Sequence, residues 1–265
     1  MDRKEYGIQR DQWSQLRAFT GARIALGRAG ISMPTQAHLD FQLAHARAKD
    51  AVRLPLDVDA LEATLRETSV DTLRLNTMAA GRSDYLQNPD LGRRLAPESA
   101  DMIRAHLSDQ VADIALVVAD GLSSIAIQRH AVPFLQVLMP LLAERGYTCS
   151  SAALIRQGRV AVADEVAEVM GSRMAVILIG ERPGLSSPDS MGIYFTFNPH
   201  AGCQDSMRNC ISNIHDHGLS YGQASTKLIY LVTEADRLGL SGVQLKDTSL
   251  HESPIQGSES NFLLE

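Results

Sequence analysis

The apolar positions of this chain follow one pattern in its first third and another in the remainder. Up to about residue 105, apolar residues recur at the spacing of three to four residues that is typical of amphipathic helices. From about residue 111 onward, continuous apolar runs alternate with longer helical patterns. This change predicts an N-terminal helical region over residues 1–105, an α/β domain over residues 106–247, and a tail rich in Ser and Glu over residues 248–265.

Helical patterns dominate the first region. Residues 11–19 form a short amphipathic pattern, and residues 35–52 form a longer one. Asp57 is expected to cap a further helix that runs through Leu65. Gly, Pro and Asn residues then mark a loop over residues 81–92.

Apolar runs in the second region predict the strands of a sheet. The run over residues 114–119 is continuous and ends at Asp120-Gly121, which is typical of a parallel strand with both faces covered. Residues 243–245 could add a last strand at the edge of the sheet. The expected strands before that point cover residues 114–119, 152–156, 174–179 and 193–198.

Helical patterns separate these runs. Ser123 or Ser124 can cap a helix that reaches about Arg145, and Pro133 and Pro140 are expected to interrupt or kink it. Two further helices are expected over residues 160–170 and 220–238. Strands joined by helices make right-handed crossovers and wind the chain over both faces of one sheet. We therefore expect an α/β fold with a Rossmann-like, doubly wound, mainly parallel sheet after the N-terminal helical region.

A charged loop follows the strand over residues 174–179, where the chain reads G-E-R-P-G from Gly180. Open α/β sheets bind ligands beyond the carboxyl ends of their strands. Charged residues at such a position are costly to desolvate without partners, so Glu181 is a candidate ligand-binding residue. The alternative is that Arg182 neutralises Glu181 and that the loop is purely structural.

Composition restricts the class of protein. The hydrophobic content of 45% and the charged content of 21% are ordinary for a soluble globular protein, and the net charge of -6 argues against a nucleic-acid binder. The three cysteines have no CxxC spacing, which favours a reducing compartment. The N-terminal letters M-D-R-K-E-Y have no apolar core of a secretory signal, and the most apolar segment, residues 132–143, is too short for a membrane span. We expect a cytoplasmic protein without a membrane segment.

Two familiar catalytic patterns are incomplete. No G-x-G-x-x-G follows a predicted strand and no Walker lysine is present, so the glycine loop of a nucleotide site is missing. The letters D-G-L-S-S at residues 120–124 resemble a nucleophile elbow, but neither Ser123 nor Ser124 has glycines two residues before and after it. Helix capping explains both serines, which disfavours a hydrolase.

Histidine and cysteine near residue 210 invite a metal interpretation that their spacing does not support. His215 and His217 are two residues apart, so they would not share a helix face, and no cysteine or carboxylate completes a known metal spacing. We interpret them as loop residues and predict no metal ligand. Cys210 lies beside Asn209 in an expected polar turn, and a lone cysteine is most often a small buried apolar residue.

Several separated motifs resemble one family, the small (light) subunit of ethanolamine ammonia-lyase. The resemblance spans roughly residues 20–247, and its motifs occur in the family's order. These motifs are T-Q-A-H-L-D-F-Q-L-A-H-A-R-A-K-D-A-V at 35–52, D-Y-L-Q-N-P-D-L-G-R-R-L at 84–95, V-A-D-G-L-S-S at 118–124, R-V-A-V-A-D at 159–164, I-G-E-R-P-G-L at 179–185 and N-C-I-S-N at 209–213.

The resemblance implies a lyase that uses adenosylcobalamin to convert ethanolamine to acetaldehyde and ammonia by a radical mechanism. In the family, a large subunit with a TIM barrel holds the substrate, the cobalamin lies between the two subunits, and six copies of each subunit assemble. The family's cobalamin contacts fall here on Val160, Glu181 and Cys210, and no catalytic residue is implied for this chain. The cofactor supplies the difficult chemistry, while the protein binds and orients it.

Two other functions stay open at this point. One is a stand-alone α/β hydrolase or dehydrogenase, which the missing elbow and glycine loop disfavour. The other is an assembly subunit that binds no ligand of its own. The resemblance also leaves two locations open, the cytoplasm at large and a bacterial microcompartment within it.

Overall fold

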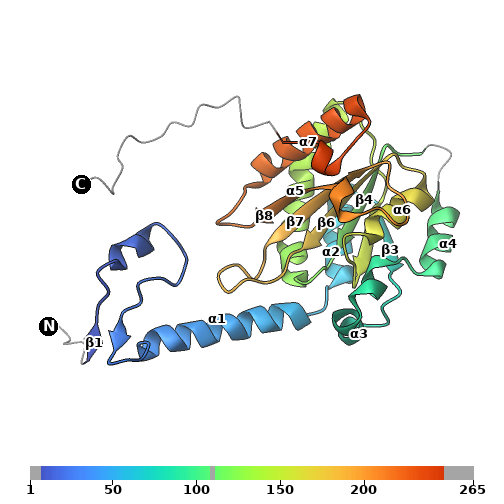
Figure 1. Ribbon diagram of the computed structural model, residues 1–265. Helices are drawn as coiled ribbons and strands as arrows, with labels where there is room; N and C mark the ends of the chain where they lie inside the picture. Colours follow the sequence, from blue (N-terminus) through green and yellow to red (C-terminus); the bar gives the residue numbers. More distant parts are fainter. Residues whose placement is uncertain (1–6, 108–110, 248–265) are drawn as a thin grey trace.

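A mixed six-stranded sheet forms the centre of the molecule in the computed structural model, which describes residues 7–107 and 111–247 (Figure 1). In spatial order the strands are β3 (Thr72–Asn76), β5 (Ala152–Arg156), β4 (Ile114–Ala119), β6 (Met174–Gly180), β7 (Met191–Phe197) and β8 (Arg208–Ile214). Neighbours from β3 to β6 are parallel, whereas β7 is antiparallel to both β6 and β8. The strands expected over residues 114–119, 152–156, 174–179 and 193–198 are confirmed, with small shifts of their ends.

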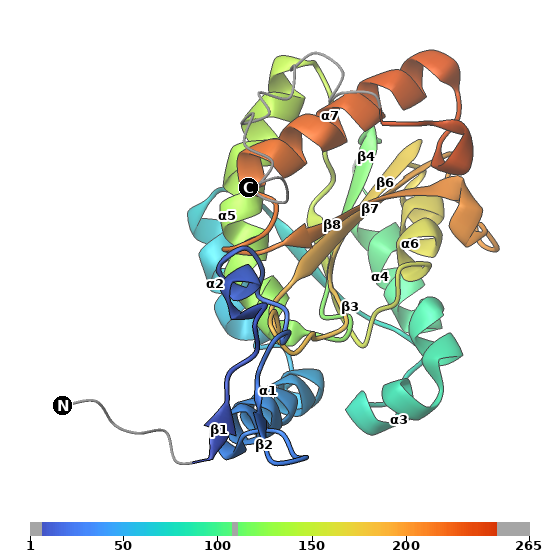
Figure 2. The same cartoon turned by 60° about the vertical axis from the view of Figure 1, so that its left-hand side comes forward.

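Helices cover both faces of the sheet. One face packs against α2 (Val58–Glu67), α5 (Ser124–Glu144) and α7 (Tyr221–Leu238), and the opposite face packs against α4 (Pro97–His106) and α6 (Val162–Met170) (Figure 2). Every residue of β4 and β6 is buried between these layers. The continuous apolar runs of the two strands follow from this burial, because a strand covered on both faces has no solvent side.

Three of the five strand pairings in this sheet are parallel, in line with the mainly parallel sheet that the sequence predicted, and β7 is the exception, being antiparallel to both of its neighbours. A parallel neighbour needs a crossover of a dozen or more residues, usually with a helix. The loop 181–190 between β6 and β7 contains no helix, and the connection 198–207 to β8 contains only the short 3₁₀ turn η3 (Asp205–Met207). The chain therefore returns beside β6 in the opposite direction. The α/β class is confirmed, and the Rossmann-like, doubly wound arrangement remains a prediction.

Two strands of the six-stranded sheet lie where the sequence predicted none. β3 falls inside residues 1–105, which we expected to be helical, and it forms the edge of the sheet beside β5. β8 occupies the segment around Cys210 that we expected to be a polar turn. Both are edge strands with partly exposed, polar sequences, so neither shows the apolar run that marks β4 and β6.

Other local expectations also changed. Residues 243–245 add no strand, because the segment forms the 3₁₀ turn η4 (Gly242–Gln244). The expected loop over residues 81–92 contains α3 (Arg82–Gln87) and the 3₁₀ turn η2 (Pro89–Arg93). The expected tail, residues 248–265, lies outside the described residues.

α5 continues through both of its prolines. Its cap is Ser123, whose Oγ accepts a hydrogen bond from the Ala126 backbone N–H at 3.3 Å. By length and composition alone α5 could cross a membrane, but half of its most apolar window is buried inside the protein. Ten of its residues, among them Phe134 and Leu138, pack into the interior, as in the core helix of a soluble protein.

The N-terminal part of the chain projects away from this body (Figures 1 and 2). We call residues 7–53 the arm. Its elements are β1 (Ile8–Gln9), which pairs with β2 (Arg28–Ala29), the 3₁₀ turn η1 (Ser14–Ala18) and the helix α1 (Thr35–Arg53). Within the arm only Pro34, Ala48 and Ala51 are buried.

Candidate functional site

One side of β7 and β8 is left open by the helices. α6 packs on β4 and β6 and reaches this side of β7 and β8 at one end, where Asp164 of α6 pairs with Arg208 of β8. In the described part of the chain, no helix packs on this side around Gly192, Tyr194 and Cys210. We call this surface the open face. Side chains alternate along β7, so Ile193 and Phe195 are buried toward α7, whereas Gly192 and Tyr194 lie on the open face. Cys210 of β8 is paired with Tyr194 and therefore lies on the same side.

Glu181 folds back onto this open face from the end of β6. Its backbone N–H donates to the Ser190 carbonyl at 2.9 Å, and the Ser190 hydroxyl donates to Glu181 Oε2 at 2.5 Å. The backbone N–H of Asn213 on β8 points to the same oxygen at 3.4 Å. A Cβ atom added at Gly192 would lie only 2.8 Å from Glu181 Oε1. The carboxylate is therefore held above Gly192 and does not extend into solvent.

Arg182 does not neutralise this carboxylate. Among the described residues no ion pair joins Arg182 to Glu181, and Arg182 is exposed. The alternative that the two charges simply cancel is therefore not what the structure shows. The contacts that orient Glu181 come from Ser190 and Asn213.

Cys210 and Tyr194 form a neutral pair beside this carboxylate. Cys210 is exposed at the surface, not buried as its sequence suggested. The protein atoms around its thiol still desolvate it and so raise its pKa; the negative charge of Glu181 raises the pKa further, while a hydrogen bond from Tyr194 opposes the shift. Burial also raises the pKa of Tyr194, as do Cys210 and Glu181. Both groups stay protonated at neutral pH. The open face thus presents a thiol, a phenol and one oriented carboxylate.

Val160 lies in the turn between β5 and α6, at the same edge of the sheet. Asp120, which directly follows β4, helps to hold this turn in place, because its Oδ1 accepts a hydrogen bond from the Gly158 backbone N–H at 3.2 Å. The Tyr85 hydroxyl donates to the Gly158 carbonyl at 3.0 Å, and the Arg159 guanidinium stacks 4.5 Å from the Tyr85 ring centre. Val160 itself is half-buried and packs against the same apolar cluster that Tyr194 packs against. The helix expected to begin at residue 160 begins at Val162.

The structure therefore brings two of the three predicted residues together directly. Glu181 and Cys210 meet around Tyr194, and Val160 packs against the same cluster from the β5–α6 turn. Sequence reasoning missed Tyr194, Gly192 and Ser190. The only local signal for Tyr194 was its place in an alternating strand, and alternation alone does not say which side is covered.

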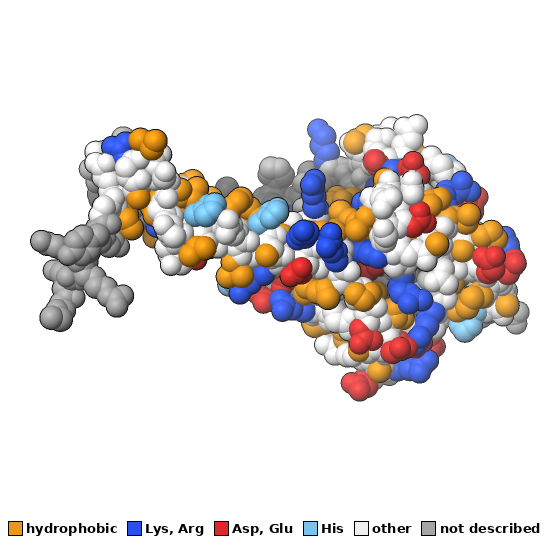
Figure 3. All heavy atoms as spheres, turned by 90° about the horizontal axis from the view of Figure 1, so that it is seen from below, with side chains coloured by type: hydrophobic (Ala, Val, Ile, Leu, Met, Phe, Trp, Pro, Cys, Tyr) orange, Lys and Arg blue, Asp and Glu red, His pale blue; other side chains and the backbone are white. Residues whose placement is uncertain are grey.

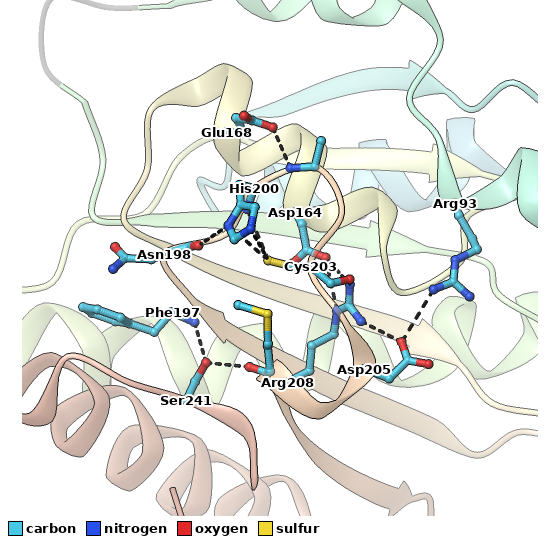
Figure 4. A network of polar contacts seen from close by, with 12 residues as sticks. Arg93, Asp164, Glu168, Phe197, Asn198, His200, Cys203, Asp205, Arg208 and Ser241 are labelled. Atoms are coloured by element: carbon cyan, nitrogen blue, oxygen red, sulfur yellow. Dashed lines mark hydrogen bonds and ion pairs between the residues drawn. The ribbon is translucent and has the colours of Figure 1, made fainter. Parts of the chain in front are cut away.

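A buried ion pair joins β8 to α6 at the far end of this face (Figure 4). Arg208 and Asp164 are each only 2% exposed, and Arg208 Nε lies 3.1 Å from Asp164 Oδ2. Arg208 also donates to the Cys203 carbonyl at 2.8 Å and to Asp205 at 2.6 Å. Burial raises the pKa of the Asp164 carboxyl, and the hydrogen bonds from Arg208 oppose that shift.

Further contacts fix the loop between β7 and β8. The Cys203 thiol lies 3.4 Å from His200 Nδ1, and Glu168 of α6 accepts the Ala201 backbone N–H at 2.7 Å (Figure 4). A pocket of about 400 Å³ opens beside this loop and is lined in part by Arg93, Arg94, Ala161, Asp164 and Asp205. The β7–β8 connection is thus tied to α6 on one side of the open face.

The loop 181–190, which we call the lip, is held at its other end by α5. The Ser123 hydroxyl donates to the Pro188 carbonyl at 2.7 Å while it accepts the capping bond of α5. Arg129 Nη1 lies 2.7 Å from Asp189. The Ser124 hydroxyl donates to the Leu54 carbonyl at 2.7 Å. Both serines of the incomplete elbow are therefore in structural hydrogen bonds.

His215 and His217 belong to the loop after β8, as expected. His215 Nε2 lies 2.8 Å from Asn213 Oδ1, and the His217 backbone N–H donates to His215 Nδ1 at 3.3 Å. Within the described ranges, no group of three or more His, Cys, Asp or Glu side chains is placed to hold a metal ion.

The reactivity of Cys210 provides a direct test of this geometry. Because only the thiolate is alkylated and the pKa of Cys210 is raised, alkylation by iodoacetamide is expected to be slow at neutral pH and to accelerate only at alkaline pH. Glu181→Gln should speed the reaction, since it removes a charge that raises the pKa. Tyr194→Phe should slow it, since it removes the opposing hydrogen bond. Peptide mass spectrometry at several pH values measures the rate; equal rates in all three proteins would show that these groups do not interact.

Comparison with known proteins identifies relatives over almost the whole chain. The model of the family "Ethanolamine ammonia-lyase light chain (EutC)" matches residues 10–246. A protein of Azotobacter vinelandii named ethanolamine ammonia-lyase small subunit is 55% identical over 257 residues, which cover 95% of each chain. A protein of the same name from Pseudomonas fluorescens is 53% identical over an alignment of 275 positions that covers 98% of each chain. Another from Pseudomonas aeruginosa is 53% identical over 260 residues, or 95% of this chain and 94% of the relative.

Proposed function

Because this chain belongs to the ethanolamine ammonia-lyase light-chain family, we propose that it is the cofactor-binding half of that lyase and holds adenosylcobalamin against its open face. As a small subunit it works with a large-subunit partner in a hetero-oligomer. The reaction is the conversion of ethanolamine to acetaldehyde and ammonia. In our proposal the large subunit contributes a TIM barrel with the substrate site.

The oriented carboxylate of Glu181 is the observation that carries this proposal. A corrin ring is surrounded by amide side arms, and an amide nitrogen donates hydrogen bonds that a carboxylate accepts. Ser190 holds the Glu181 side chain above Gly192. The hydrogen bonds from Ser190 and Asn213 both go to Oε2, so Oε1 remains available to accept a hydrogen bond from the cofactor. A carboxylate fixed in this way loses little conformational entropy on binding.

The residues around Glu181 suit the same ligand. Tyr194 and Cys210 are neutral at physiological pH, so they provide a partly apolar surface on which a ring edge can rest. Val160 adds an aliphatic side chain at the β5–α6 turn. When bound, the cobalamin supplies the radical chemistry of the reaction. The role of this chain is to bind the cofactor, to orient it and to exclude water from one of its sides.

The open face also explains why a second subunit is needed. A cofactor that rests on β7 and β8 is covered from one side only, and radical chemistry requires exclusion of water from both. We therefore place the large subunit over the open face, in an assembly of six copies of each subunit. The assembly is placed in the cytoplasm, inside a microcompartment where the host forms one.

A titration of the purified complex tests the proposed function. We expect the co-expressed subunits to bind adenosylcobalamin with a visible absorption change and to release ammonia from ethanolamine. The large subunit alone should bind the cofactor at least tenfold more weakly, which corresponds to about 1.4 kcal/mol. Equal affinity with and without this chain would instead identify it as an assembly subunit without a ligand of its own.

Gly192→Ala tests the position of the Glu181 carboxylate without changing any polar group. The new methyl group would lie 2.8 Å from Glu181 Oε1, so the flexible carboxylate must move while the strand stays in place. Because the shifted carboxylate loses its hydrogen bond to the cofactor, we expect about tenfold weaker cobalamin binding in the complex. Gly222→Ala on α7 is the matched control, since an added Cβ there meets no atom within 4 Å. Unchanged affinity in the Gly192 variant would contradict the assigned position of Glu181.

A further inference from the structure

We propose that the arm, residues 7–53, is a docking segment that attaches this chain to the large subunit and that continues the interface beyond the open face. The inference rests on the proposed function, because it assumes that the large subunit covers the side of the molecule on which the lip lies. It adds a second place of contact, separate from the cofactor.

The arm exposes more large apolar side chains for its length than the rest of the described chain. Of the seventeen large apolar side chains that are exposed within the described ranges, nine lie between Ile8 and Leu43. Trp13 is 63% exposed and Phe19 is 74% exposed. Figure 3 shows apolar side chains along the arm where it stands away from the body. A concentration of exposed apolar side chains in one segment indicates an interaction site, whereas single residues scattered over a surface do not.

The helix α1 lacks the packing that normally stabilises a helix. Most helical stability in proteins comes from burial of one face, yet in α1 only Ala48 and Ala51 near its end are buried. Leu39 and Leu43 are one helical turn apart, and both are about half exposed. A partner that covers this row would supply the missing burial.

The chemistry of the arm indicates what kind of surface covers it. Residues 7–33 contain four arginines and one aspartate, a net charge of +3 in a chain whose overall charge is -6. Arginine, tryptophan, phenylalanine and methionine are enriched in protein–protein interfaces, and arginine and tryptophan among the residues that dominate binding energy. The complementary surface is therefore an apolar groove of another protein, bordered by carboxylates.

A contact between the arm and the lip indicates that the large subunit is the partner that covers the arm. Arg23 Nη2 donates to the Leu185 carbonyl at 3.3 Å, and Leu185 follows Glu181 by four residues. The arm thus reaches the loop that positions the carboxylate of the open face. A partner that covers the cofactor beyond Glu181 can therefore extend over the lip onto the arm.

Two double variants test the docking role. Leu39→Glu with Leu43→Glu places charges in the exposed row of α1, and we expect at least a tenfold loss of affinity for the large subunit, measured by retention on a tagged large subunit after co-expression. The matched control is Val137→Glu with Leu238→Glu, two comparably exposed apolar positions on α5 and α7. The control should assemble normally. Circular dichroism and thermal melting of each small subunit report whether its fold is kept.

Each outcome decides the matter. Wild-type retention of the Leu39 and Leu43 variant would overturn the proposal. Light scattering could also overturn it. If the small subunit alone forms a dimer, and the variant disrupts that dimer but still binds the large subunit, the arm joins two copies of this chain instead. If the variant does not fold, Trp13→Ser with Phe19→Ser replaces it, with the same loss expected. A different result would contradict the proposed function: a complex that assembles normally but binds cobalamin no more tightly than the large subunit alone.

Discussion

Arg208→Ala is expected to lower the free energy of unfolding by about 3–5 kcal/mol, because it breaks a buried ion pair by removing one partner. Arg208 and Asp164 are each 2% exposed, so removal of the guanidinium leaves the Asp164 carboxylate buried without its partner. The same change also removes the donors to the Cys203 carbonyl and to Asp205, which fix the β7–β8 loop. Urea denaturation followed by circular dichroism measures the loss.

Arg237→Ala is the matched control for this prediction. Arg237 also forms an ion pair, with Glu234, but it is 64% exposed, so solvent screens the pair and its loss should change the free energy of unfolding little. Asp164→Ala should be destabilising in the same way as Arg208→Ala, and the double variant should lose less than the sum of the two. Additive losses, or equal losses for Arg208→Ala and Arg237→Ala, would show that the buried pair does not act as a unit.

Glu181→Ala is expected to weaken cobalamin binding to the assembled enzyme by about tenfold to a hundredfold, since a hydrogen bond to a charged group contributes roughly 1.5–3 kcal/mol. The fold should be kept, because Glu181 is half-buried and lies at the end of β6. Equilibrium titration of the complex, followed by the absorption of the corrinoid, measures the change.

Two further variants interpret that result. Ser190→Ala leaves the carboxylate but removes the hydroxyl that holds it, so we expect a smaller loss of affinity than for Glu181→Ala. Glu234→Ala removes a carboxylate from α7 and should leave binding unchanged. If the complex with Glu181→Ala binds cobalamin with wild-type affinity, the assignment of the open face as the cofactor site is wrong.

The sequence predicted the interior of the sheet better than its edges. β4 and β6 are buried on both sides, and this burial appears in the sequence as continuous apolar runs. β8 buries Arg208, Ile211 and Ile214 and exposes most of the residues between them. That spacing is neither a continuous run nor a strict alternation, so the strand looked like a polar turn. β3 was missed for a related reason, since it is a short edge strand with only one fully buried residue.

The candidate site was predictable only in part. Glu181 could be found from the residues alone, because a charged residue directly after a buried strand lies at the edge of the sheet. Val160 and Cys210 came from resemblance to a family, and nothing in their local sequence marks them. Tyr194 becomes apparent only when the pairing of β7 with β8 is known, because that pairing places its side chain beside Cys210.

The orientation of Glu181 is set before any ligand binds, and under the proposed function this affects how the cofactor would be exchanged. Ser190 and the backbone of Asn213 already orient the carboxylate, and Ser123 ties the lip to the first turn of α5. Under the proposed function, this chain would have little need to rearrange when the cofactor binds. Exchange of a spent corrinoid for a fresh one would then depend on separation of the two subunits, at a rate set by the strength of their association.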